Sequence, residues 1–112
     1  MEIRSKIWLE INGEPVFGSG RQNLLTAIDK YGSINRAAKE MNISYRKAFS
    51  YIQAMEDRLG ISLVERKTGG SHGGGATLTG KAKIFLEKYE LLEKGLNEFV
   101  DKKFGQVFKN IK

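Results

Sequence analysis

Residues 33–59 read SINRAAKEMNISYRKAFSYIQAMEDRL, and their pattern predicts two helices joined by a tight turn. Ser33-Ile34-Asn35 precedes a short first helix over residues 36–41, and Ser44 is suited to the N-cap of a second helix over residues 45–59. Apolar residues at spacings of three and four give each helix one inward face. These faces comprise Ala37, Ala38 and Met41 in the first helix and Ala48, Ile52, Met55 and Leu59 in the second. The pair is therefore expected to form a helix-turn-helix.

A β-hairpin is expected before this pair, over residues 3–17. Apolar residues largely alternate along residues 3–11, Asn12-Gly13 is a strong signal for a tight turn, and residues 15–17 can return as a second strand. A further helix over residues 23–31, ended by Gly32, follows the hairpin.

A second pair of strands is expected after the helix-turn-helix. Residues 63–66 and 76–78 read as short strands, and they flank the glycine-rich stretch 69–75. Glycines permit positive φ angles and close backbone approach, as the tip of a DNA-binding wing requires. We therefore predict a wing over residues 63–78 and a DNA-binding domain over residues 1–78.

The remainder of the chain, residues 79–112, predicts one long helix with a heptad seam. The seam follows spacings of three and four and comprises Ala82, Phe85, Tyr89, Leu92, Leu96 and Phe99. It is too long and too apolar to be covered by one small domain. We therefore expect Phe85, Tyr89, Leu92, Leu96 and Phe99 to serve dimerisation. The fold class is then mainly α with a small β component, a winged helix-turn-helix with an N-terminal hairpin and a long C-terminal helix.

Composition narrows the class of partner. The 112 residues include 19 Lys and Arg against 13 Asp and Glu, which leaves a net charge of +6 and favours polyanions such as DNA. The absence of cysteine is compatible with a reducing cytosol, and no apolar run approaches the ~20 residues of a membrane span. We expect a cytoplasmic protein with no membrane contact.

The second helix of the pair presents a polar face to solvent, and this face is the candidate DNA reader. Tyr45, Arg46, Ser50 and Gln53 are expected to contact base edges. Phosphates would be anchored by Ser44, Lys47, Arg66, Lys67 and Lys81. Ser33 and Phe49 complete the predicted DNA-binding set.

No catalytic, cofactor or metal site is expected. Residues 75–82 read GATLTGKA and nearly spell a phosphate-binding P-loop, but Ala82 stands where the motif needs a magnesium-binding hydroxyl. His72 is the single histidine, so no histidine cluster can hold a metal. We find no convergent acid–base pair and expect no enzymatic activity.

The motifs of the central region resemble those of a known family. Gly32–Lys39, Ile43–Arg46, Glu56, Leu59-Gly60 and Leu63–Arg66 are similar to the DNA-binding domain of LysR-type regulators. Similarity is closer to the N-terminal domain of ModE-type molybdate-responsive regulators, at Ile43–Arg46, Thr68–Gly70, Gly73–Ala76, Leu78 and Thr79. The resemblance implies a homodimer on a palindromic operator, with recognition helices in successive major grooves. Regulators of this type carry oxyanion-binding domains after the long helix, whereas this chain ends at Lys112, so we expect no molybdate binding here.

The leading hypothesis is a homodimeric, sequence-specific DNA-binding transcriptional regulator, for which the resemblance implies molybdate-related genes as targets. One alternative is a winged helix that binds protein through the long helix, which the cations Arg46 and Lys47 argue against. Another is an RNA-binding protein, which would expose aromatic residues on a sheet; Trp8 is the only hint of that.

Overall fold

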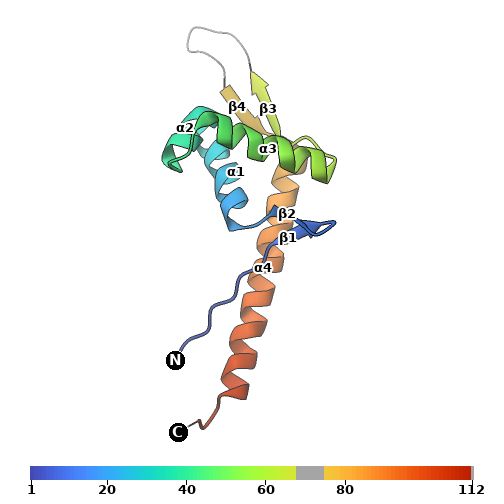
Figure 1. Cartoon of the computed structure of the whole chain (residues 1–112). Helices are drawn as coiled ribbons and strands as arrows, with labels where there is room; N and C mark the ends of the chain where they lie inside the picture. The colour runs from blue at the N-terminus through green and yellow to red at the C-terminus, as the bar shows by residue number, and fades with distance from the viewer. Residues whose placement is uncertain (68–74, 112) are drawn as a thin grey trace.

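The computed structural model describes residues 1–67 and 75–111. Along the chain lie β1 (Leu9–Ile11), β2 (Glu14–Phe17), α1 (Ser19–Tyr31), α2 (Ile34–Glu40), α3 (Tyr45–Leu59), β3 (Val64–Lys67), β4 (Gly75–Leu78) and α4 (Gly80–Val107). Each pair of strands forms its own antiparallel two-stranded sheet. Figure 1 shows three short helices gathered under the β3–β4 wing, while α4 extends far beyond them. The predicted winged helix-turn-helix is confirmed.

Helix α3 covers residues 45–59 as predicted, and local capping sets both of its ends. The Ser44 side chain accepts a hydrogen bond from the Lys47 N–H at 3.0 Å, and Gly60 ends the helix in the left-handed conformation with φ of 72°. Asn42, in the turn between α2 and α3, also has a positive φ of 57°. Asparagine tolerates this conformation, which lets the chain reverse within a few residues.

Two predicted boundaries of the first helices are wrong by a few residues. Helix α1 begins at Ser19 rather than at residue 23, because the Gly18 carbonyl accepts from the Gln22 N–H at 2.9 Å and starts the helix there. Helix α2 covers Ile34–Glu40 rather than residues 36–41, because the Ser33 hydroxyl caps it by accepting from the Arg36 N–H at 3.1 Å.

The predicted strand over residues 3–11 is also too long. The Asn12-Gly13 turn forms as expected, with φ of 53° and 81°. However, β1 begins only at Leu9, because β2 offers no more than Glu14–Phe17 as a pairing partner before α1 starts. Residues 1–8 instead run extended beside α4 (Figure 1).

Two hydrogen bonds tie this N-terminal segment to α4. The Tyr89 hydroxyl donates to the Ile7 carbonyl oxygen at 2.9 Å, and the Ser5 hydroxyl donates to Asn97 Oδ1 at 2.7 Å. Burial, with the Glu93 carboxylate as a second cause, raises the pKa of Tyr89 above its ordinary value. The shift favours the protonated phenol, which is the form that donates to the Ile7 carbonyl oxygen.

The core lies where α1, α2 and α3 meet the strands and the start of α4. Its largest fully buried side chains are Phe17, Leu24, Leu25, Ile28, Met55 and Leu63. The Phe17 ring packs edge-on against Phe85 and Tyr89, with centroid separations of 4.8 Å in both cases. The first hairpin is thereby packed against α4.

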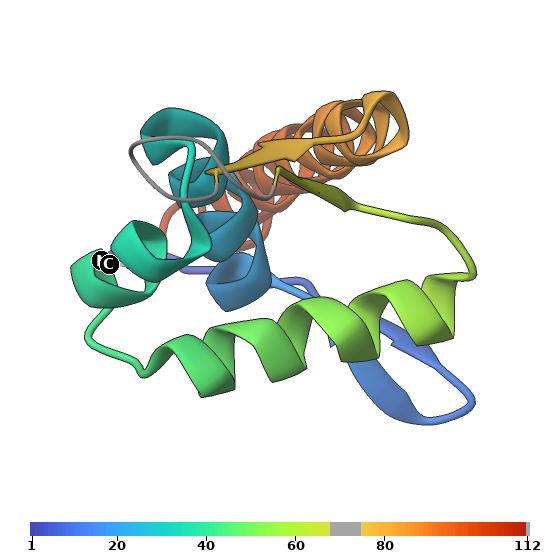
Figure 2. The same ribbon diagram turned by 90° about the horizontal axis from the view of Figure 1, so that it is seen from above.

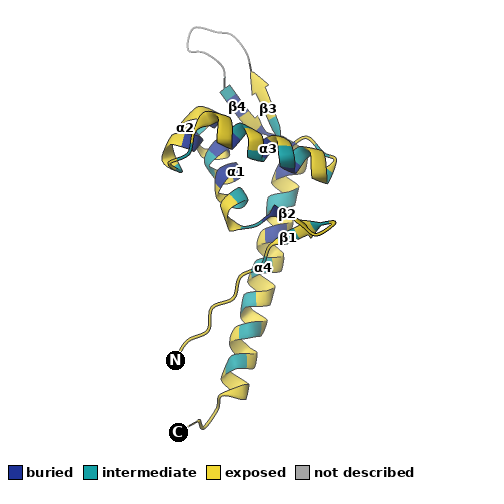
Figure 3. Ribbon diagram, viewed as in Figure 1, coloured by how far each residue is buried: buried dark blue, intermediate teal, exposed yellow. Residues whose placement is uncertain are grey.

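Helix α4 is the reason for the elongated shape, which measures 65 × 28 × 22 Å. The radius of gyration is 17.5 Å, whereas a compact chain of this length would have one of about 13 Å. Figure 3 shows that the far part of the helix is mostly exposed. Within the described residues, no helix combines the length and apolarity needed to span a membrane.

Candidate nucleic-acid interface

Helix α3 separates a buried face from a polar one, as its periodicity predicts. Ala48, Ile52 and Met55 are buried in the core. Opposite them, Phe49 is half-buried and the exposed side chains are Tyr45, Arg46, Lys47, Ser50 and Gln53. In Figure 2, α3 lies along one side of the molecule with no other helix in front of it. The face carries the forked cation and the side-chain amide that reading of base edges requires.

Three serine hydroxyls on this surface have different hydrogen-bonding capacity. Ser33 and Ser44 accept from backbone N–H groups at the starts of α2 and α3, so each can still donate its own proton to a phosphate. Ser50 instead donates to the Lys47 carbonyl oxygen at 2.8 Å. In this arrangement Ser50 offers only acceptor lone pairs to a base.

The cations around α3 are not neutralised by ion pairing. Across residues 1–67 and 75–111 the single ion pair joins Arg4 to Glu2, both in the exposed N-terminal segment. Arg46, Lys47, Arg66 and Lys67 therefore have no carboxylate partner within 4.0 Å in that part of the chain. An uncompensated positive surface attracts the phosphate backbone of a nucleic acid.

The wing is fastened to the helix-turn-helix at the rung that pairs Arg66 with Ala76. The Ala76 N–H donates to the Gly32 carbonyl oxygen at 2.9 Å, and a Cβ added at Gly75 would lie 3.2 Å from that oxygen. On β3, the Arg66 guanidinium carbon lies 4.0 Å from the centroid of the Phe49 ring. The wing base is therefore attached to both the α1–α2 junction and α3.

Lys81 lies apart from the other predicted phosphate anchors. It lies in the first turn of α4, and Figure 2 shows that α4 begins on the opposite side of the β3–β4 hairpin from α3. The glycine-rich segment predicted as the wing loop, His72 included, lies outside the described residues except for Gly75.

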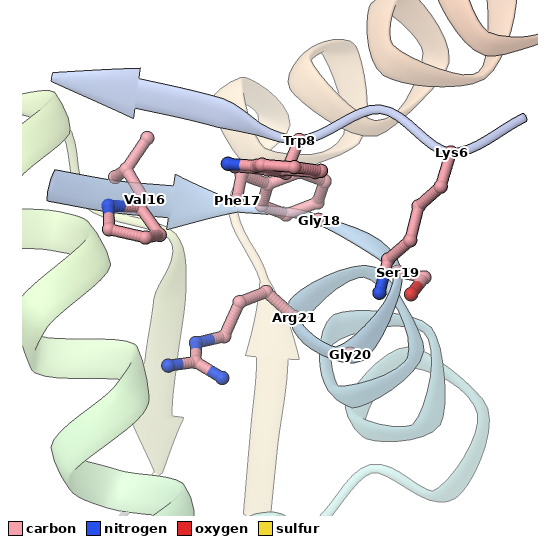
Figure 4. A pocket seen from close by; sticks show the side chains of 9 residues that line it. Lys6, Trp8, Val16, Phe17, Gly18, Ser19, Gly20 and Arg21 are labelled. Atoms are coloured by element: carbon pink, nitrogen blue, oxygen red, sulfur yellow. The ribbon is translucent and has the colours of Figure 1, made fainter. Parts of the chain in front are cut away.

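A cavity of about 360 Å³ lies away from the predicted DNA-binding set, between the first hairpin and the start of α1. Figure 4 shows the Trp8 ring lying over Phe17 and Gly18, while the Arg21 side chain extends toward α3. None of the predicted site residues lines this cavity. It is a junction between elements rather than part of the α3 surface.

Comparison with known families assigns the chain. Residues 22–83, more than half of its length, match the family described as "Bacterial regulatory helix-turn-helix protein, lysR family". The chain belongs to this family. The matched range contains most of α1, all of α2 and α3, and the described strands of the wing, so the surface described above lies within the region that the family model matches.

Relatives of this lysR-family chain include regulators named for molybdenum. The transcriptional regulator ModE of Haemophilus influenzae is 45% identical over 74 residues, which cover 66% of this chain and 29% of the relative. The DNA-binding transcriptional dual regulator ModE of Escherichia coli K12 is 43% identical over 72 residues, or 64% of this chain and 28% of the relative. The chain thus spans less than a third of the length of these relatives.

Among solved structures, the CbnR DNA-binding domain in complex with DNA is similar, with a TM-score of 0.57 and 25% identity. The alignment covers 79% of this chain and 95% of that one. The crystal structure of CbnR, a LysR family transcriptional regulator, gives a TM-score of 0.55 over 77% of this chain and 28% of that one, and it shares the fold.

Sequence reasoning missed two tertiary contacts of the lysR-family fold. Glu56 appeared in the sequence only as part of a family motif, but its Oε2 accepts from the N–H groups of Leu63 at 2.7 Å and Val64 at 3.3 Å. A carboxylate that accepts two backbone N–H groups fixes the start of β3 against the end of α3. No local signal distinguishes this glutamate from its solvated neighbours.

Tyr51 was also missed. The Arg21 guanidinium carbon lies 3.7 Å from its ring centroid, and the Lys47 ammonium lies 5.9 Å from the same centroid. The spacing of Lys47 and Tyr51, four residues apart on α3, could have indicated the second contact. The first joins α1 to α3 and depends on the tertiary fold.

The predicted seam of α4 divides into two parts. Ala82 and Tyr89 are buried in the domain core and Phe85 is half-buried. Farther along, Leu92, Leu96 and Phe99 are 46%, 38% and 65% exposed. The far part of the helix therefore carries an apolar stripe that the described residues of one protomer leave open (Figure 3).

Proposed function

We propose that this protein is a homodimeric transcriptional regulator that binds DNA in a sequence-specific manner. The observation that carries the proposal is the exposed face of α3, polar and cationic, fastened beside a basic wing within a lysR-family domain. Such a helix fits the major groove, with its first two turns toward the bases. Its action would take place in the cytoplasm, on chromosomal DNA.

The residues divide by chemistry into two roles. Tyr45, Arg46, Ser50 and Gln53 would read base edges, with Phe49 beside them. The hydroxyls of Ser33 and Ser44 and the cations of Lys47, Arg66 and Lys67 would bind phosphates. Lys81 would reach only DNA that passes behind the wing, and it is the member that the geometry supports least.

The partner copy would dock along α4. Leu92, Leu96 and Phe99 continue the heptad spacing of the buried part of the seam, so a second α4 could cover them by side-chain interdigitation. Two recognition helices related by a two-fold axis then require a palindromic operator.

The regulated genes would concern molybdenum. This part of the proposal is supported by the names of the relatives, among them the molybdenum transport protein ModE of Azotobacter vinelandii, 42% identical over 73 residues.

Selection of bound sequences from a random duplex pool tests the proposed function directly. We expect enrichment of one palindrome, with each half-site contacted by one protomer. Recovery of unrelated duplexes at equal affinity would contradict sequence-specific binding and favour a winged helix that binds another protein.

Base readers and phosphate anchors are expected to differ in their effect on binding. Arg46→Ala should weaken operator binding by about 1–3 kcal/mol and relax specificity at one base pair. Lys67→Ala should weaken all sequences alike and reduce the slope of log K against log[salt] by about one unit. Fluorescence anisotropy with operator and scrambled duplexes measures both. Unchanged specificity in Arg46→Ala would remove this residue from the reading face.

Molybdate is not expected to bind the residues of this chain. A tetrahedral oxyanion needs converging N–H groups, hydroxyls and cations in a closed pocket. The cavity near α1 is lined by Lys6, Ser19 and Arg21 as well as by apolar side chains, but it is open to solvent, so it offers no closed pocket. Isothermal titration with molybdate and tungstate should show no saturable heat at micromolar concentration, with sulfate as the control anion. Saturable binding, or an operator affinity that changes with molybdate, would contradict this expectation.

A further inference from the structure

The half-buried aromatic residue Phe49 interrupts the polar face of α3, and its ring has two partners. Tyr45, one turn earlier, lies nearly parallel to it, with centroids 6.2 Å apart and an interplanar angle of 20°. The Arg66 guanidinium carbon lies 4.0 Å from the Phe49 centroid. We call Tyr45, Phe49 and Arg66 the aromatic–arginine cluster. It joins the first turns of the recognition helix to the wing.

Arg66 occupies a particular place on the wing. It pairs with Ala76, whose N–H is bound by the Gly32 carbonyl oxygen, so this rung is held at the α1–α2 junction through the backbone. On the α3 side, the same rung is held through the side-chain contact between Arg66 and Phe49. The described part of β3 ends one residue later, at Lys67.

A guanidinium that stacks on a ring keeps the N–H groups at its edge free to donate. The contact with the Phe49 ring restricts the motion of the Arg66 head group and so lowers the entropy lost when those N–H groups bind an anion. Lys67, on the same strand, is exposed as Arg66 is, and no aromatic ring of residues 1–67 or 75–111 lies beneath its ammonium group.

We infer that Phe49 is a positioning residue, which holds Arg66 in the orientation that binds a DNA phosphate while α3 reads the adjacent bases. This inference rests on the proposed function, since it specifies how the wing and the recognition helix act as one DNA-binding unit. It predicts that a change at Phe49, which removes no charge, reduces the electrostatic component of binding.

The test measures operator affinity as a function of salt for Phe49→Leu, Arg66→Ala and the double variant. Leucine retains an apolar side chain but has no aromatic face. Phe49→Leu should weaken binding by about twofold to fivefold and reduce the salt slope by about 0.9, the value of one phosphate contact. Arg66→Ala should reduce the slope by the same amount, and the double variant should lose no more than Arg66→Ala alone.

Lys67→Ala provides the matched control, because it removes a cation from the same strand. Its loss of slope should add to that of Phe49→Leu, and the combined variant should lose about two contacts. Phe49→Tyr, which keeps the ring, should restore the slope. In the free protein, the NMR signals of the Arg66 side chain should show a ring-current shift that disappears in Phe49→Leu.

The outcomes separate the two levels of the proposal. A wild-type protein that binds no duplex overturns both the proposed function and this inference. Wild-type binding with an unchanged salt slope in Phe49→Leu, or with additive losses in the Phe49→Leu and Arg66→Ala double variant, overturns the inference alone. Thermal unfolding of each variant verifies that the domain is folded. If the salt slope fell only in a variant that is unfolded, this result would also contradict a positioning role for Phe49.

Discussion

Replacement of both Leu92 and Leu96 by glutamate is expected to convert the proposed dimer into monomers. The two side chains are 46% and 38% exposed in one protomer, yet they continue a seam that is buried at Ala82 and Tyr89. In a two-helix interface they would be desolvated, and an unpaired carboxylate there costs several kcal/mol, by order of magnitude. Sedimentation at micromolar concentration measures the change. Affinity for a two-half-site operator should fall by about a hundredfold or more, because the second half-site no longer binds intramolecularly.

Lys83→Ala with Lys94→Ala is the matched control for this variant. It changes the net charge by the same amount, and both lysines are exposed on α4 at positions turned away from the seam. The dimer should persist in this control. A monomeric wild-type protein at micromolar concentration would contradict the proposed role of the seam.

Phe17→Ala is expected to lower the free energy of unfolding by about 3–5 kcal/mol, the largest loss of stability among the variants proposed for this protein. Phe17 is 2% exposed and packs edge-on against both Phe85 and Tyr89, so its removal opens a cavity between the first hairpin and α4. Urea unfolding at fixed protein concentration gives the value, since the proposed dimerisation would couple stability to concentration.

Trp8→Ala serves as the control in the same hairpin region. Trp8 is 54% exposed, so its removal uncovers much less apolar surface and should cost clearly less stability than that of Phe17. Equal losses in the two variants would show that the aromatic contact with α4 does not hold the hairpin.

The errors in the sequence predictions share one physical origin. Alternation over residues 3–8 predicted strand, but a strand needs a pairing partner, and β2 is too short to supply one. The first helix was predicted to start only at residue 23, because glycine at residues 18 and 20 disfavours helix, whereas packing of Leu24 and Leu25 in the core stabilises a helix that starts at Ser19. In each case a local preference was overridden by what lies beside it in space.

The sequence alone determined the bounds of α3, its exposed and buried faces, and the Asn12-Gly13 turn. Each depends on local chemistry, namely capping, helical periodicity and positive φ angles, which act within a few residues. The sequence also contains the motifs by which the helix-turn-helix resembles the family. Only the tertiary structure decided how the wing lies against α3. That placement depends on contacts between residues distant in the chain, such as Gly32 with Ala76 and Phe49 with Arg66, and no periodicity encodes such pairs.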